Sequence, residues 1–269
     1  MKLKKAIYYF LEHKDRFIEI HIVDSCNLNC KSCAHFSPLA EPNYIDINDL
    51  EKMYKNLSKN HNIHFNRIRL LGGEPLLHQN ITNIIILTRK YFPHKRIEIV
   101  TNGLLISKMN DTFFKECKNN RIYIYVSQYI KVIDYTNILK ILKDNHVKYY
   151  ISSPVLNFKN YYLNPKATNK KQNENYKNCQ YGGKCLQLRN NKLYPCYTIA
   201  YIEYLNKFFN MNFKESKDDY IELDHKISKK EFKKIINKSV PFCKYCNMEK
   251  VKNIKWETSK MNKNEWIIE

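Results

Sequence analysis

Residues 17–33 read FIEIHIVDSCNLNCKSC. The first seven residues are mostly apolar and place Ile18, Ile20 and Ile22 on one face, which predicts a β-strand that ends at Asp24. Three cysteines follow this strand on one loop, with three and then two residues between them: Cys26, Cys30 and Cys33. Three thiols so close in sequence can converge on one inorganic group.

Strands and helices alternate over the following residues. Strands are predicted at 67–71, 96–101, 121–126 and 147–151, and helices at 46–59, 80–91, 104–117 and 135–144. This alternation predicts an α/β fold with βαβ units around a parallel sheet, either an open sheet or a full or partial barrel. No sixth strand is evident in residues 152–178, which are rich in Asn, Lys and Tyr.

The next two predicted strands also end in polar motifs. Gly72, Gly73 and Glu74 follow the second strand, and Thr101 and Asn102 end the third, just before Gly103. The carboxyl ends of parallel strands meet at one edge of the sheet, where functional groups gather. The glycines predict a close approach of the backbone to a ligand. The chain has only five glycines, and all lie in candidate motifs, the other two being Gly182 and Gly183.

Together these motifs resemble the radical S-adenosylmethionine (SAM) superfamily, over about residues 17–155. The resemblance implies a partial (β/α)6 barrel and a reaction that begins with reductive cleavage of SAM. It also implies roles for individual residues. Cys26, Cys30 and Cys33 would hold a [4Fe-4S] cluster whose fourth iron binds SAM. Gly72, Gly73 and Glu74 would bind its amino group, Thr101 and Asn102 would lie near its methionine or ribose part, and Ser127 matches a position that is often polar.

One residue departs from the family pattern. An aromatic side chain is frequent just before the third cysteine, but Ser32 stands there. Phe36 or apolar residues from later strands would then pack against the adenine. The alternative of a zinc knuckle is disfavoured, because a structural zinc site needs four protein ligands and His35 is poorly spaced to be the fourth.

Five further cysteines lie beyond residue 178, around a predicted hairpin at 186–197 and helices near 201–209 and 229–236: Cys179, Cys185, Cys196, Cys243 and Cys246. Cys185, Cys196, Cys243 and Cys246 could form a zinc ribbon. The segment also resembles the SPASM and Twitch extensions of radical SAM enzymes, with Asn191 in place of the usual hairpin glycine. That resemblance implies an auxiliary [4Fe-4S] cluster, and five cysteines fit the shorter Twitch type.

Which four of these five cysteines would bind the cluster stays open at this point. Cys179, Cys185 and Cys196 could join one of the last pair, or the last pair could join two of the first three. The fifth would then be a hydrogen donor to a substrate radical or a structural residue. Cys117 lies alone in a predicted helix and is interpreted as a core residue.

The predicted organisation has four parts: an N-terminal extension (1–16), a radical SAM core (17–155), a connector (156–178) and a Twitch-like domain (179–269). The net charge of +20 suggests nucleic acid or a membrane, but only seven basic residues are Arg and the lysines are scattered. We therefore expect no nucleic-acid partner. No apolar run is long enough to span a bilayer and no signal peptide is evident, so we expect a cytoplasmic protein without a membrane partner.

The sequence thus predicts an enzyme with SAM and two [4Fe-4S] clusters as cofactors. In the size of its Twitch-like extension the chain resembles enzymes that dehydrogenate sugar-like rings. We therefore expect hydrogen abstraction from a small polar metabolite and a net oxidation. A reducing partner such as flavodoxin or ferredoxin would supply the electron. One alternative is a peptide- or protein-modifying oxidase of the same family. Another is a non-catalytic iron-sulfur or zinc protein that binds nucleic acid.

Overall fold

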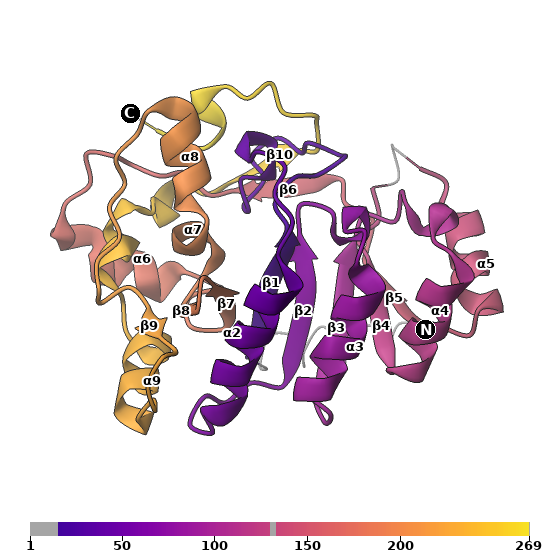
Figure 1. Ribbon diagram of the computed structural model, residues 1–269. Coiled ribbons are helices and arrows are strands. Elements are labelled where there is room, and N and C mark those ends of the chain that lie inside the picture. The colour runs from indigo at the N-terminus through magenta and orange to yellow at the C-terminus, as the bar shows by residue number, and fades with distance from the viewer. Residues whose placement is uncertain (1–15, 130–132, 269) are drawn as a thin grey trace.

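The computed structural model describes residues 16–129 and 133–268 (Figure 1). All but Arg16 of the predicted N-terminal extension, residues 1–16, lies outside them. Eight strands form one sheet in the order β5-β4-β3-β2-β1-β7-β8-β9. Their bounds are β1 Phe17–Val23, β2 Arg67–Gly72, β3 Arg96–Thr101, β4 Ile122–Val126, β5 Lys148–Ile151, β7 Cys185–Arg189, β8 Lys192–Tyr194 and β9 Ile221–Glu222.

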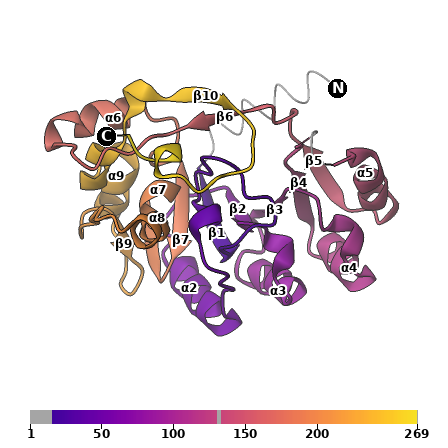
Figure 2. The ribbon, with the colours of Figure 1, turned by 90° about the horizontal axis from the view of Figure 1, so that it is seen from above.

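Four helices follow the first four strands in turn and cover the outer face of the sheet, as the view from above shows (Figure 2). They are α2 Ile47–Lys59, α3 Ile81–Tyr91, α4 Asp111–Asn119 and α5 Tyr135–Asp144. The side chain of Asp46 caps α2 at the N–H groups of Asn48 and Asp49. The predicted helix at 104–117 begins later than expected, because Asn110 caps α4 by accepting the N–H of Phe113.

The two faces of β1 have different environments, as its alternation predicts. Ile18, Ile20 and Ile22 are fully buried in the hydrophobic core beneath the helices. Phe17 and Glu19 point to the inner face, where they line a cavity. The strand therefore separates the apolar core beneath the helices from the cavity on the inner face.

A sixth parallel strand comes from the predicted C-terminal hairpin. β7 pairs with β1 in parallel, with Phe17 opposite Cys185 and Glu19 opposite Gln187. It turns back into β8, which is antiparallel to it. The fold class is confirmed as an α/β fold with a largely parallel sheet consistent with a partial barrel, and the hairpin continues this sheet at the β1 edge.

The remaining elements form the C-terminal part of the molecule. Its helices are α6 Gln172–Asn178, α7 Tyr197–Ala200, α8 Ile202–Phe209 and α9 Lys229–Asn237, and its strands β6 Asn157–Asn160 and β10 Lys252–Lys255 pair antiparallel to each other. A second hydrophobic core lies here, with Trp266 and Tyr201 among its buried side chains. β6 and β10 cross the upper end of the sheet, near the ends of β1 and β2 (Figures 1 and 2).

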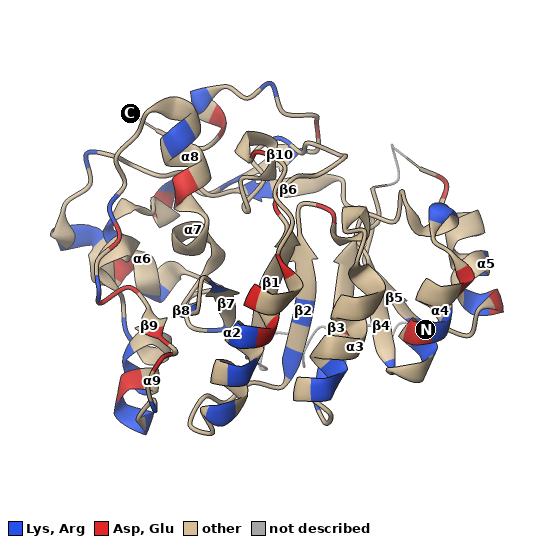
Figure 3. Ribbon diagram, in the orientation of Figure 1, with Lys and Arg blue, Asp and Glu red and all other residues tan. Residues whose placement is uncertain are grey.

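Two expectations from composition concern the surface. Lys and Arg are spread over helices and loops throughout the molecule (Figure 3). In the part of the chain that the structure describes, none of the helices combines the length and the apolar character that crossing a membrane requires.

Candidate active site

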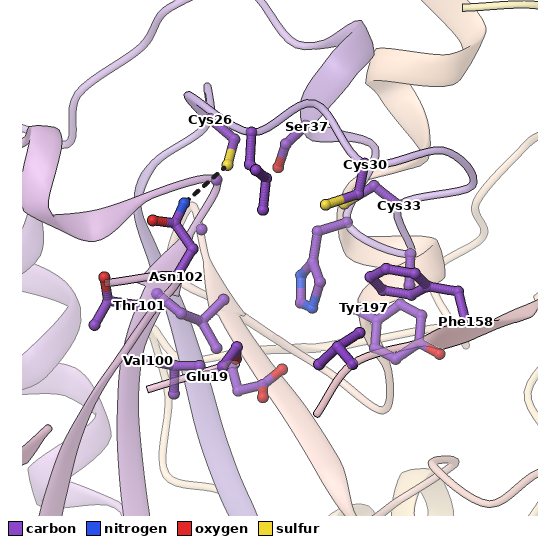
Figure 4. Close-up of a pocket in the computed structure, with 18 of the residues that line it drawn as sticks. Glu19, Cys26, Cys30, Cys33, Ser37, Val100, Thr101, Asn102, Phe158 and Tyr197 are labelled. Carbon is purple, nitrogen blue, oxygen red and sulfur yellow. Dashed lines mark hydrogen bonds between the residues drawn. The ribbon is translucent and has the colours of Figure 1, made fainter. Parts of the chain in front are cut away.

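The cysteine loop lies directly above the end of β1. Its chain is sharply turned, because Asn29, Ser32 and Phe36 all have positive φ angles. Cys26, Cys30 and Cys33 line one cavity of about 540 Å³, and in Figure 4 the thiols of Cys26 and Cys30 stand at its upper rim. Three thiols separated by up to seven positions in sequence are thus presented to one space.

The glycines at the end of β2 hold the cysteine loop against the sheet. The N–H of Gly73 donates to the carbonyl of Val23 at 2.8 Å, and that of Glu74 to Ser25 at 3.0 Å. A Cβ on Gly72 would lie 1.9 Å from the Val23 oxygen, and one on Gly73 would lie 1.9 Å from the Ser25 oxygen. Both glycines line the cavity. Besides lining the cavity, the two glycines thus approach the backbone at the end of β1 and at the start of the cysteine loop closely.

Gly103 has a different reason for being glycine. Its φ is +86°, and an added Cβ would meet side chains of Val126 and Ile138 at 3.2 and 3.3 Å. Gly103 does not line the cavity. Gly103 thus shapes the turn after β3 against β4 and α5, and the predicted approach of its backbone to SAM stays a prediction.

Glu74 joins the ends of β2 and β3 from a buried position. Its Oε1 accepts from the Thr101 hydroxyl at 2.7 Å and from the N–H of Leu76 at 3.0 Å, and its Oε2 accepts from the N–H of Asn102 at 2.9 Å. The side chain is fully buried and does not line the cavity. Glu74 thus fixes the position of Thr101 and Asn102, and its predicted contact with SAM stays a prediction.

Thr101, Asn102 and Ser127 lie on the cavity wall, as their places at strand ends predict. The side-chain amide of Asn102 donates to Asn27 Oδ1 at 2.8 Å and lies 3.9 Å from the Cys26 sulfur (Figure 4). The hydroxyl of Tyr135 donates to the carbonyls of Asn102 and Ser127, each at 3.1 Å. This buried tyrosine, which the sequence analysis did not single out, holds two strand ends in register.

The buried carboxyl group of Glu74 makes a test of stability against pH possible. Burial raises the pKa of Glu74 to about 7, although its three hydrogen-bond donors lower it. The folded protein therefore binds this proton more tightly than the unfolded chain, so the stabilisation is complete below about pH 4.5 and is lost as the pH rises through 7. Urea unfolding of the metal-free protein at pH 5 and pH 8 measures this loss, which in wild type should be of the order of 3 kcal/mol of unfolding free energy. Glu74→Gln should lose less. The control is Glu222→Gln, which changes an exposed carboxylate. If Glu74→Gln and wild type lost the same free energy of unfolding between pH 5 and pH 8, the raised pKa of Glu74 would be contradicted.

The thiols of the cysteine loop hold their protons when no metal is bound. Burial raises the pKa of Cys26 and of Cys30 to about 12, and also raises that of Cys33. Without metal these groups are neutral thiols, and metal binding would release their protons. The indole N–H of Trp256 donates to the Cys30 sulfur at 3.1 Å, a contact of the kind that tunes the potential of a thiolate-bound cluster.

Trp256 belongs to a segment that covers the cysteine loop and that the sequence analysis missed. We call residues 256–266 the strap. The N–H of Lys31 donates to the carbonyl of Glu257 at 2.9 Å, and the N–H of Ser259 donates to that of Asn29 at 2.7 Å. The indole N–H of Trp266 donates to the carbonyl of Cys33 at 2.9 Å. The strap therefore holds the loop in place from outside. The one sequence feature that could have marked it is that both tryptophans of the chain, Trp256 and Trp266, belong to it.

The second set of cysteines divides between two cavities. Four of them line one small pocket beside the main cavity: Cys179, Cys196, Cys243 and Cys246. Burial raises the pKa of Cys196 to about 12 and of Cys243 to about 11, and the nearby thiol of Cys179 adds to both shifts. Cys185 instead lines the main cavity, where its thiol donates to Glu19 at 2.9 Å.

This division helps to choose between the two predicted metal sites of the segment, a zinc ribbon and an auxiliary [4Fe-4S] cluster. The zinc ribbon of Cys185, Cys196, Cys243 and Cys246 is not assembled, because Cys185 faces the other cavity. Over residues 16–129 and 133–268, no three His, Cys, Asp or Glu side chains are grouped to hold a single metal ion. In a zinc site each sulfur lies about 2.3 Å from one central ion. In a cubane each thiolate binds a different iron, so the four sulfurs lie farther apart.

Comparison with known proteins places this geometry in a family. Residues 20–152, which contain the cysteine loop and the ends of the first four strands, match the radical SAM superfamily. The chain belongs to this superfamily. Its members bind a [4Fe-4S] cluster and SAM, which agrees with three thiols and the Gly72–Gly73 turn on one cavity.

Curated relatives resemble this chain only over part of their length. A GTP 3',8-cyclase of Trichodesmium erythraeum is 30% identical over 103 residues, which are 37% of this chain and 31% of the cyclase. One from Clostridium acetobutylicum is 34% identical over 95 residues, 35% of this chain and 29% of that enzyme. The match thus spans less than a third of the length of these cyclases.

A solved structure resembles a larger part of the chain. The crystal structure of BtrN in complex with AdoMet and 2-DOIA matches with a TM-score of 0.52 and 19% identity, over 87% of this chain and 93% of BtrN. At this identity the likeness shows a shared fold. It extends beyond the radical SAM core into the C-terminal part.

Proposed function

We propose that this radical SAM enzyme carries two [4Fe-4S] clusters and oxidises a small polar, sugar-like molecule. The first cluster would be held by Cys26, Cys30 and Cys33, and the second, in a Twitch-like extension, by Cys179, Cys196, Cys243 and Cys246. When bound, the first cluster and SAM supply a radical that takes a hydrogen atom, and the second cluster takes up an electron.

The observation that carries this proposal is that the two cysteine-lined cavities share a wall. Tyr161, Tyr181 and Tyr197 line both cavities. Their rings are in edge-to-face contact, with centroids of Tyr161 and Tyr181 5.8 Å apart and those of Tyr181 and Tyr197 5.5 Å apart. A substrate in the main cavity would be separated from the second cysteine set by one aromatic layer, which suits removal of an electron after hydrogen abstraction.

The cavity itself supports a small-molecule substrate. Its volume of about 540 Å³ lies in the range of small-molecule sites, roughly 300 to 1,000 Å³. Its walls combine apolar rings such as Phe17 and Tyr197 with polar side chains of Glu19, Arg69 and Asn102. BtrN, which shares the fold, was solved with AdoMet and 2-DOIA, so 2-DOIA is a reasonable first compound to try.

The test is anaerobic reconstitution with iron and sulfide, followed by metal analysis and a SAM cleavage assay. We expect about eight irons per chain, two cubanes, and conversion of SAM to 5′-deoxyadenosine in the presence of dithionite. Dithionite stands in for the redox protein, flavodoxin or ferredoxin, that we propose as electron donor. One zinc per chain without SAM cleavage would reject the proposal.

The choice of four among the five C-terminal cysteines gives a separate prediction. Cys243→Ala should lower the iron content from about eight to about four per chain and spare SAM cleavage, because Cys243 lines the second pocket. Cys185→Ala should keep all the iron, since Cys185 lines the main cavity. Iron analysis with electron paramagnetic resonance of the reduced proteins measures both. Loss of iron in Cys185→Ala would overturn this assignment.

A further inference from the structure

The end of the main cavity opposite the cysteine loop carries buried polar side chains that have no part in holding either cluster. We call Glu19 of β1, Arg69 of β2 and Cys185 of β7 the floor cluster. Glu19 Oε2 accepts from the Cys185 thiol at 2.9 Å, and Glu19 Oε1 lies 3.7 Å from Arg69 Nη1. All three residues line the cavity that the cysteine loop roofs. In Figure 4, Glu19 lies across the cavity from Cys26 and Cys30.

The distance between roof and floor suits a small substrate placed next to SAM. Glu19 precedes Val23, the last residue of β1, by four positions, which is about 13 Å along a strand. The cysteine loop begins just beyond Val23. A cofactor held at the loop would thus leave the lower part of the cavity, beside Glu19, for the substrate.

The environment of Glu19 leaves it as a hydrogen-bond acceptor. Burial raises the pKa of Cys185 well above its usual range, so its thiol keeps the proton that it donates to Glu19. Gln187 also donates to Glu19 Oε2, at 2.8 Å. Arg69 is shared, because its Nε donates to Glu98 at 2.9 Å. Two donors therefore reach Oε2. The contact of Oε1 is longer, 3.7 Å to Arg69, which also lines the cavity.

We propose that the floor cluster binds a hydroxyl group of the substrate and that Glu19 accepts the proton of this hydroxyl during oxidation. This inference rests on the proposed function. After a hydrogen atom leaves the carbon that bears the hydroxyl, the O–H bond breaks and its proton goes to the Glu19 carboxylate. The carbon–oxygen double bond forms as one electron leaves for the second cluster, so a secondary alcohol becomes a ketone.

The roles within the floor cluster follow from these contacts. Glu19 is the catalytic residue, because it would touch the reacting hydroxyl. Cys185 and Arg69 are positioning residues, which hold the two carboxylate oxygens. The substrate class is a small polyhydroxylated molecule, since a carboxylate and a guanidinium together offer an acceptor and donors to neighbouring hydroxyl groups.

The test uses reconstituted holoenzyme and a panel of 2-DOIA, inositols and hexoses. Binding is measured by calorimetry in the presence of S-adenosylhomocysteine, so that no turnover occurs, and ketone formation is measured separately with SAM and dithionite. Glu19→Gln should weaken binding of the best compound about tenfold and slow ketone formation about 100-fold.

Two further variants serve as controls. Glu98→Gln changes a buried carboxylate that contacts Arg69 but does not line the cavity, and it should leave binding near the wild-type value. Cys185→Ser keeps a donor to Glu19 and should retain most activity. Thermal melting of each variant checks folding.

Several results would overturn the inference while leaving the proposed function intact. These are wild-type enzyme that cleaves SAM but binds no member of the panel, and equal loss of binding in Glu19→Gln and Glu98→Gln. Abolished ketone formation in Cys185→Ser with an active Glu19→Gln would make Cys185 the reacting group instead. Failure of wild-type enzyme to cleave SAM would reject the proposed function itself.

Discussion

Cys30→Ala is expected to abolish reductive cleavage of SAM and to lower the iron content from about eight to about four per chain. Cys30 lines the main cavity, and its sulfur accepts the indole N–H of Trp256 at 3.1 Å. Two remaining thiols would not hold a cubane that also binds SAM. The backbone of Cys30 forms a bridge with Thr258, which alanine preserves, so the variant should fold. Chromatography of 5′-deoxyadenosine and iron analysis measure the two effects.

Cys117→Ala is the matched control for this prediction. Cys117 is fully buried in α4 and belongs to the outer hydrophobic core, as predicted. Its replacement should cost about 1 kcal/mol of stability and leave iron content and SAM cleavage near wild type. If Cys30→Ala cleaved SAM as well as Cys117→Ala, the cysteine loop would not be the cluster site.

Gly73→Ala is expected to lower SAM cleavage by about 100-fold. Its φ is not positive, so the backbone conformation alone would admit alanine. However, the added Cβ would lie 1.9 Å from the carbonyl oxygen of Ser25 and 2.7 Å from the nitrogen of Cys26. The cysteine loop must then move away from the sheet by an ångström or more. Initial rates of 5′-deoxyadenosine formation measure the loss.

Gly182→Ala provides the comparison for Gly73→Ala. Gly182 also lacks a positive φ, and its added Cβ would meet the ring edge of Tyr176 at 3.0 Å, a side chain that can shift. SAM cleavage should stay near wild type. Comparable losses in both variants would show that glycine is not required for contact with the cysteine loop.

The parts of this structure that the sequence predicted are those encoded in short segments. Alternating isoleucines placed β1 and its buried face, and cysteine spacing marked the loop above it. The ends of β2 and β3 could be placed at one edge, because parallel strands always meet there. These local signals sufficed for the fold class and for bringing Thr101 and Asn102 near the cysteines.

Features that depend on distant pairing could not be predicted in this way. β7 pairs with β1 across 168 residues, the separation of Phe17 and Cys185, and nothing in either segment names its partner. The same pairing separates Cys185 from the other four C-terminal cysteines, which spacing alone left undecided. Likewise, the sequence indicated a ligand as the reason for Gly73, but not the backbone of the cysteine loop, which an added Cβ at Gly73 would meet.

The strap also has a consequence for the order in which this protein is made. Trp256 follows Cys30 by 226 residues, so the cysteine loop leaves the ribosome long before the segment that covers it. During that interval the loop lacks the hydrogen bonds that the strap makes with Asn29, Lys31 and Cys33. We therefore expect the loop to take its final conformation late, after residues 256–266 have been synthesised.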